Sequence, residues 1–214
     1  SVSARRMLNR ISLPQRPTPH RHRLRMSEAA FASLVEDLFR QHYAVLPDFF
    51  SPAQIRTWHD DAAATSRQGL FRVAAVGRNA DLLRDTSIRG DTIHWLEPDT
   101  LIPAQQAYLA FLETLRLQLN EQFMLGLFAA ECHYAHYVAG SFYKKHLDRH
   151  QGSRERVISV ICYLNDDWQA QDGGQLRLYL DDKTLDVPPL AGTLVCFFSD
   201  RITHEVLAVK RELK

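Results

Sequence analysis

The chain has 214 residues, of which 45% are hydrophobic and 24% charged, with a formal net charge of +1. This composition is ordinary for a soluble protein, and the length suits one large domain, or one domain with appendages, with a full core. Every apolar run is well short of the ~20 residues that a membrane-spanning helix needs, so we expect no membrane partner. Cys132, Cys162 and Cys196 lie far apart in apolar segments. We expect buried free thiols in a cytoplasmic protein, not a disulfide framework or a zinc site.

The first 25 residues contain seven arginines and no acidic residue, and they are interrupted by three prolines. Because this segment, 1–25, has no apolar face, it is predicted to be a disordered basic leader. Three origins fit it: upstream residues included by the choice of start site, which Met26 favours, an organelle-type presequence, or a nucleic-acid-binding arm. Residues 26–214 carry 19 basic and 25 acidic side chains, a net charge of −6. An acidic body argues against nucleic acid as its partner.

The first half of the remaining chain has helical periodicity. Apolar residues recur at helical spacing from Phe31 onward, and the pair Ser51-Pro52 combines an N-cap residue with proline at the first helical position. The predicted elements are a helix starting at Ser27, a strand at 43–46, a helix from Pro52 toward Arg67, a loop at 77–92 and a helix from Pro103 to about Leu119.

From about residue 130 the periodicity changes to that of short strands separated by glycine-containing turns. The predicted strands are 131–138, 142–147, 156–165, 175–180, 193–198 and 202–208. Helices followed by many short strands predict an α+β fold, in which the helices pack on one face of a β-sandwich or jelly roll.

One pattern in this strand-rich half indicates a metal centre. His146 and Asp148 are two residues apart, so on a strand both side chains point to the same face. His204, 56 residues after Asp148, can complete a set of two imidazoles and one carboxylate. That set, with open positions, is the coordination typical of non-haem Fe(II) oxygenases. His150 could replace His146 as a ligand, and a simple ion pair between a histidine and an aspartate on a surface strand is the alternative without a metal.

Ordered sequence blocks surround these residues and carry a family resemblance. The blocks are Tyr137–Asp148, Arg156–Trp168, Gly173–Leu178, Val187–Asp200 and His204–Val206. Their succession resembles the prolyl hydroxylases of the 2-oxoglutarate and Fe(II)-dependent oxygenase superfamily. Ile88–Pro98 is similar to the substrate loop and following strand of the hypoxia-inducible-factor (EGL-nine) type, which has bacterial relatives. The resemblance covers about residues 80–214.

The resemblance implies a double-stranded β-helix (jelly roll) core with N-terminal helices packed on one sheet, formed by a single domain at 26–214. It also implies Fe(II), 2-oxoglutarate and O2 as cofactors, with ascorbate as a further reductant. The family usually finishes its sheet with a Ser/Thr-rich strand after the position of Lys214. The domain at 26–214 therefore either lacks the last strand of the family's sheet or departs from the family pattern.

The resemblance assigns roles to individual positions. His146, Asp148 and His204 match the metal ligands. The residues that match the 2-oxoglutarate pocket are Tyr137, Tyr163, Leu176, Val206 and Lys214. All except the lysine are also suitable core residues.

The cation of that pocket departs from the EGL-nine pattern. Leu213 stands nine residues after His204, where that type has arginine. Lys214, ten residues after, matches the lysine spacing of collagen-type prolyl hydroxylases, and Arg211 is the alternative. A buried carboxylate needs such a partner.

Substrate contacts are expected on the Arg-Gly-Asp turn and near it. Arg89 and Asp91 could clamp a peptide backbone or each other, and Arg156 matches a position near the substrate proline. Trp95 is included with them, although such a residue is more often a packing anchor than a substrate contact. As a whole, the resemblance implies a monomeric, cytoplasmic protein prolyl 4-hydroxylase linked to oxygen sensing, whose bacterial relatives act on elongation factor Tu. An oxygenase for free amino acids or small molecules and a non-catalytic jelly-roll binding module are the alternatives.

Overall fold

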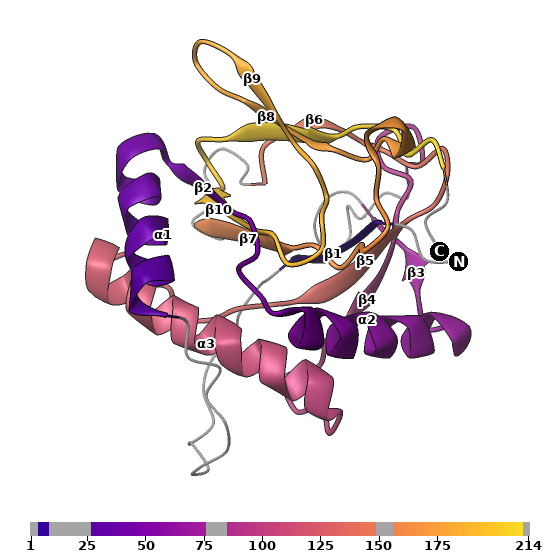
Figure 1. Cartoon of the computed structure of the whole chain (residues 1–214), viewed down its shortest axis with the longest axis horizontal. Coiled ribbons are helices and arrows are strands. Elements are labelled where there is room, and N and C mark those ends of the chain that lie inside the picture. Colours follow the sequence, from indigo (N-terminus) through magenta and orange to yellow (C-terminus); the bar gives the residue numbers. More distant parts are fainter. Residues whose placement is uncertain (1–3, 9–26, 76–84, 149–155, 212–214) are drawn as a thin grey trace.

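The computed structural model describes residues 4–8, 27–75, 85–148 and 156–211. Within these ranges the three α-helices come early, with short strands between them, and strands dominate the rest (Figure 1). In chain order they are β1 (Ala4–Leu8), α1 (Glu28–Gln41), β2 (Tyr43–Leu46), α2 (Pro52–Arg67), β3 (Arg72–Val73), β4 (Thr92–Trp95), α3 (Pro103–Phe123), β5 (His133–Tyr137), β6 (Tyr143–His146), β7 (Ile158–Cys162), a short 3-10 helix (Ala170–Asp172), β8 (Leu176–Tyr179), β9 (Thr184–Val187), β10 (Leu194–Phe198) and β11 (Thr203–Val206).

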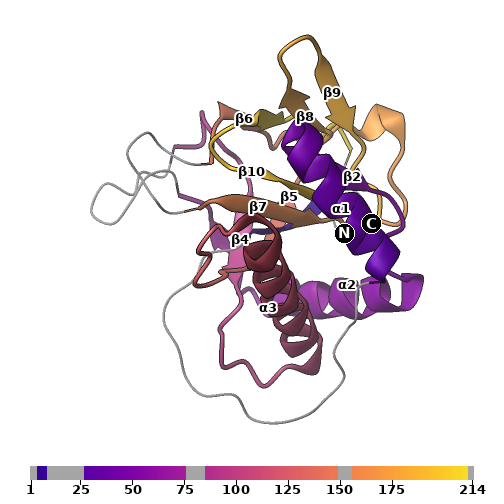
Figure 2. The same ribbon diagram turned by 90° about the vertical axis from the view of Figure 1, so that its left-hand side faces the viewer.

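The strands form two facing layers, and the helices cover the outer side of one of them. The covered layer consists of the sheets β2-β10-β7 and β1-β5-β4-β3, which adjoin because β1 contacts β7. The opposite layer is the sheet β6-β11-β8-β9, and all strand pairs in the named sheets are antiparallel. Figure 2 shows α2 and α3 on one side of the strands and the β8–β9 hairpin on the other. This is the predicted jelly-roll arrangement with helices packed on one sheet.

Strand alternation divides the core into two parts. In β10, Leu194 and Cys196 pack with the helices in an outer core, whereas Val195 and Phe197 belong to an inner core between the two layers. All four side chains are fully buried. Because burial of a large apolar side chain contributes about 1.5–3 kcal/mol, both faces of this central strand stabilise the fold.

Helix starts follow the sequence signals. The Ser27 hydroxyl accepts a hydrogen bond from the backbone N–H of Ala30 at 3.1 Å, which caps α1. At α2, Ser51 and Gln54 form a reciprocal capping box, with Pro52 at the first helical position. The third helix begins at the predicted Pro103 and runs past the predicted end to Phe123, where a left-handed C-cap follows. The structure therefore confirms the three predicted helices.

Outside the leader, two described strands, β3 and β9, were not predicted. The strand β9 pairs with β8 at the edge of its sheet, and its Thr184 and Asp186 are exposed. An edge strand buries few side chains, so its apolar alternation is weak and the sequence does not reveal it. The short β3 is exposed for the same reason. Of the predicted loop at 77–92, residues 77–84 lie outside the described residues, and Thr92 already belongs to β4.

The prediction of a disordered leader is wrong for residues 4–8. This segment forms β1, which pairs antiparallel with β5 in a register that runs from Ala4 opposite Tyr137 to Leu8 opposite His133. Backbone groups on the open edge of β5 can bind any extended segment, whatever its side chains, and this overrides the low apolar content of the leader. Residues 1–3 and 9–25 of the leader lie outside the described residues.

All three cysteines are buried free thiols, as predicted. Burial raises the pKa of the Cys196 thiol to about 12, and it also raises the pKa of the thiols of Cys132 and Cys162. Among the helices of the described residues, none combines the length and apolar character that crossing a bilayer requires.

Candidate metal centre

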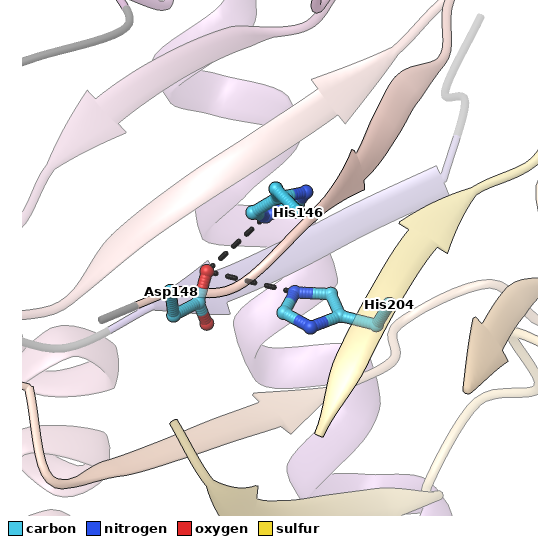
Figure 3. Close-up of side chains that lie close together, drawn as sticks. All are labelled: His146, Asp148 and His204. Atoms are coloured by element: carbon cyan, nitrogen blue, oxygen red, sulfur yellow. Dashed lines mark hydrogen bonds and ion pairs between the residues drawn. The ribbon is translucent and has the colours of Figure 1, made fainter. Parts of the chain in front are cut away.

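The three predicted metal ligands come from two neighbouring strands. His146 ends β6, Asp148 follows two residues later, and His204 lies in β11 directly opposite His146. Residues directly opposite each other in antiparallel strands share a face, so the register brings the two imidazoles together. Figure 3 shows all three side chains converging on one point.

The distances fit one metal ion. Asp148 Oδ1 lies 3.2 Å from His146 Nε2 and 3.5 Å from His204 Nε2. One candidate ligand atom from each residue lies within 4.8 Å of the others, and this group could hold a metal ion. His204 and Asp148 are buried, and His146 is half-buried at the mouth of the group. The arrangement is the set of two histidines and one carboxylate that the spacing predicted.

Backbone carbonyls fix the tautomer of both rings. His146 Nδ1 lies 2.7 Å from the Lys144 carbonyl oxygen, and His204 Nδ1 lies 3.0 Å from the Ile202 carbonyl oxygen. A carbonyl can only accept, so both Nδ1 atoms carry hydrogen and both Nε2 atoms present a lone pair. Each ring is thus oriented by the residue two positions before it.

These lone pairs make the group suitable for binding a cation. His204 Nε2 is buried and has no hydrogen-bond partner among the described residues. His146 Nε2 also directs its lone pair at the carboxylate of Asp148. Burial lowers the pKa of His146 and so disfavours a second proton on that ring. A divalent metal ion between the three atoms would satisfy all of them, so the residues present fit a metal.

Three residues that the sequence analysis did not single out contact the predicted metal ligands. The Tyr143 ring stacks on His146 with centroids 3.7 Å apart, and Phe197 packs against His204 at 4.8 Å. The Ser159 hydroxyl donates a 2.6 Å hydrogen bond to Asp148 Oδ2. A signal existed only for Ser159, which is the single polar residue of the otherwise apolar strand β7.

The residues predicted for the 2-oxoglutarate pocket lie in the inner core. Tyr137, Tyr163, Leu176 and Val206 are all buried there, in the same cluster as the ring of Phe197. The two tyrosines come from β5 and from the end of β7, and the two aliphatic side chains come from the opposite layer. The structure therefore brings four of the five predicted residues together, and their contact with a cosubstrate stays a prediction.

Of the two residues proposed as the cation of that pocket, the structure describes only Arg211. Lys214 lies outside the described residues. Arg211, the alternative, binds Asp172 through two hydrogen bonds, Nε to Oδ1 at 2.6 Å and Nη2 to Oδ2 at 2.8 Å. This pairing engages its guanidinium with a carboxylate of the protein itself.

In the Arg-Gly-Asp turn the two charged side chains bind each other. Arg89 donates to Asp91 from Nε at 2.7 Å and from Nη2 at 2.6 Å, and the Asp91 side chain is fully buried. Burial opposes the charge of Arg89, but the hydrogen bonds to Asp91 hold the pKa of this guanidinium above its usual value. Of the two predicted arrangements, a clamp on a peptide or on each other, the structure has the second. The guanidinium also lies 4.3 Å from the centroid of the Tyr143 ring.

The two other residues predicted to contact substrate remain open to solvent. Trp95 is 41% exposed and packs one side against His133, with ring centroids 4.6 Å apart. Arg156 is exposed just before β7, in a left-handed backbone conformation with φ of 53°. These positions leave both side chains available for a partner.

Comparisons with known proteins agree with this geometry. Residues 132–214 match the family described as the 2OG-Fe(II) oxygenase superfamily. A solved prolyl-4-hydroxylase from Pseudomonas putida is 37% identical, with a TM-score of 0.77, over 85% of this chain and 93% of that protein. Human Egl nine homolog 1 is 30% identical over 163 residues, which are 72% of this chain and 36% of that protein.

A more distant structure shares the fold. A prolyl hydroxylase from Trichoplax adhaerens, solved with a hypoxia inducible factor oxygen degradation domain peptide fragment, has a TM-score of 0.73 at 24% identity, over 85% of this chain and 84% of that protein. The chain spans less than half the length of the curated relatives it matches. It covers nearly all of the Pseudomonas enzyme, at an identity that is high enough to establish kinship. The identity to this enzyme and the family match, together with three residues that could hold a metal ion, show that the chain belongs to the 2OG-Fe(II) oxygenase superfamily.

Proposed function

We propose that the protein is a protein prolyl 4-hydroxylase that uses Fe(II), 2-oxoglutarate and O2. The observation that carries this proposal is the convergence of candidate ligand atoms of His146, His204 and Asp148 within 4.8 Å of one another, with His204 and Asp148 buried. The 37% identity to the Pseudomonas prolyl-4-hydroxylase supports the same reaction. The reaction takes place in the cytoplasm, with ascorbate as an auxiliary reductant.

Each part of the site has a task in this reaction. His146, Asp148 and His204 would hold iron on one face, and iron supplies the activation of O2 that amino-acid side chains cannot perform. The hydroxyl of Tyr163 would bind the cosubstrate carboxylate, Tyr137 would line the same pocket, and Lys214 would neutralise the carboxylate. Leu176 and Val206 exclude water from the pocket, which strengthens those polar contacts.

The protein substrate binds to the exposed side chains of Arg156 and Trp95. A guanidinium can donate to peptide carbonyls, and an indole can pack against a proline ring. Arg89 and Asp91, as a closed pair, shape the turn beside this surface. Elongation factor Tu is the proposed substrate because the resemblance to bacterial relatives points to it.

The test is mass spectrometry of purified elongation factor Tu after incubation with the protein, Fe(II), 2-oxoglutarate and air. A mass increase of one oxygen on a proline, together with formation of succinate, is the expected result. His204→Ala should abolish both, whereas His59→Ala, on the distant helix α2, should leave both unchanged. Succinate formation without modified elongation factor Tu would refute this substrate.

Hydroxylation of a free amino acid or another small molecule is the second candidate. The observation that favours it is that Arg89 and Asp91 bind each other instead of presenting separate charges to a peptide backbone. Turnover of free proline with no peptide present would distinguish it. A non-catalytic binding module, by contrast, would fail to bind Fe(II) and 2-oxoglutarate in stoichiometric amounts.

A further inference from the structure

We propose that Ser159 and Ser199 are positioning residues that keep Asp148 bound to the metal through one oxygen only. This inference rests on the metal site of the proposed function and adds residues and a role that the motif does not contain. Its physical basis is that the two oxygens of Asp148 have different surroundings, and that a pair of buried hydroxyls creates the difference.

The hydrogen bonds around Asp148 have one consistent direction. Oδ1 faces the two imidazoles, at 3.2 Å and 3.5 Å. Oδ2 accepts a 2.6 Å hydrogen bond from Ser159 Oγ, and Ser159 Oγ lies 2.7 Å from Ser199 Oγ. A serine hydroxyl has a single proton, and Ser159 gives its proton to the carboxylate. Ser199 is therefore the donor to Ser159, and the two aligned hydroxyls reinforce each other.

The strands hold both hydroxyls in place. Ser159 lies in β7 opposite Phe197 of β10, and Ser199 follows two residues after Phe197. The backbone N–H of Ser199 donates to the Val157 carbonyl at 3.0 Å, which fixes the end of β10 against the start of β7. Because Phe197 packs on His204, one patch of this layer supports both His204 and Asp148.

The burial of the two serines requires a strong acceptor. Ser159 is 3% exposed and Ser199 is fully buried. A buried hydroxyl without a partner costs about 1–3 kcal/mol, so an apolar residue would suit these positions better if they served packing alone. A carboxylate is the acceptor that makes such hydrogen bonds short and strong, and Asp148 Oδ2 is that acceptor.

The consequence concerns the open positions of the metal. A carboxylate that binds through both oxygens would occupy a position that the cosubstrate or O2 requires. Because Oδ2 accepts the hydrogen bond from Ser159 and Oδ1 faces the two imidazoles, Asp148 would bind metal through Oδ1, and the centre would keep three protein bonds and its open positions. Removal of the hydroxyl should therefore weaken the binding of 2-oxoglutarate as well as that of the metal.

The experiment measures binding without turnover. Fe(II) is titrated anaerobically into the metal-free full-length protein, and 2-oxoglutarate is then titrated into the loaded protein, followed by its charge-transfer absorption. Ser159→Ala should lower the affinity for Fe(II) about 10–100-fold, the usual effect of losing a partner of a metal ligand, and weaken the 2-oxoglutarate band. Ser159→Thr, which keeps the hydroxyl, should restore both, and Ser199→Ala should show a smaller loss in the same direction.

A matched control separates positioning from packing. Thr65 is also buried, but its hydroxyl donates to the Asp61 carbonyl within α2, so Thr65→Val should leave both affinities unchanged. Ser159→Ala and Ser199→Ala variants that remain folded and bind Fe(II) and 2-oxoglutarate as the unsubstituted protein does would overturn the inference. If Ser159→Ala does not fold, Ser199→Ala alone decides between these results.

Failure of the proposed function gives a different result. A protein that binds Fe(II) and 2-oxoglutarate but does not modify elongation factor Tu leaves the role of the serines intact. A protein that binds no Fe(II) at all overturns both the metal site and the inference that depends on it.

Discussion

Breaking the buried ion pair of the Arg-Gly-Asp turn should destabilise the protein strongly. Asp91 is fully buried and the Arg89 side chain is 11% exposed, so neither charge is well solvated. Arg89→Met would leave the Asp91 carboxylate buried without its bidentate partner. Loss of one member of a buried pair costs about 3–5 kcal/mol, and we expect a loss of about that size in the free energy of unfolding.

Urea denaturation of four proteins tests this magnitude: the unsubstituted chain, Arg89→Met, Asp91→Asn and the double variant. The double variant should be less destabilised than the sum of the single variants, because it removes both charges together. Arg40→Met is the matched control, since Arg40 binds Asp37 on the surface with 64% and 25% exposed side chains. An exposed pair of this kind contributes about 0.2–1 kcal/mol. If Arg89→Met costs no more than Arg40→Met, the reasoning about burial is wrong.

Arg89→Met should also affect the metal centre. Arg89 lies over the Tyr143 ring, which stacks on His146, so the turn and the metal ligand share one stack of planar groups. Two backbone bonds join the same segments, Gly90 N–H to the Phe142 carbonyl and Lys144 N–H to the Ile88 carbonyl. Arg89→Met should therefore also weaken Fe(II) binding in the fraction of protein that remains folded.

Three other outcomes are expected. Tyr163→Phe removes one hydroxyl from the predicted cosubstrate pocket and should weaken 2-oxoglutarate binding by about 1.5–3 kcal/mol, measured by titration, while Fe(II) affinity is unchanged; equal 2-oxoglutarate affinity would exclude the contact. The hydrogen bonds from Arg211 lower the pKa of Asp172, so this pair stabilises the fold at neutral pH and its contribution is lost as the pH falls through the lowered pKa. The unsubstituted protein should accordingly lose more stability between about pH 5 and pH 3 than Arg211→Gln, and parallel losses would contradict this. Because burial raises the pKa of Cys196 to about 12, a thiol reagent at neutral pH should label the cysteines only after denaturation; rapid labelling of the folded protein would show that the thiols are accessible.

Local signals in the sequence were sufficient for much of the fold. Helix starts at Ser27, Pro52 and Pro103 were predictable because caps and prolines act within one turn of the chain. Strands with one or both faces buried were predictable because such burial leaves a clear apolar pattern in the sequence. The edge strand β9 and the leader strand β1 were not, since backbone pairing at a sheet edge places few demands on side chains.

The candidate site was predictable where one element supplies the geometry. His146 and Asp148 follow from the two-residue period of a strand, but the position of His204 opposite His146 depends on the register between β6 and β11. The sequence gives no direct signal for that register, and the family resemblance supplied it instead. The partnership of Ser159 with Ser199 joins residues 40 apart, and no local pattern marks such a pair.

The donor set of the centre has a consequence for how the protein acquires iron. Two imidazole nitrogens and one carboxylate oxygen, with no thiolate, do not select Fe(II) over its neighbours in the first transition series. Affinity at such sites rises from manganese through iron, cobalt and nickel to copper, so nickel or cobalt should displace iron whenever they are abundant. The identity of the bound ion is thus decided by metal supply, and protein purified over an immobilised nickel column would carry an inert ion until a chelator strips it.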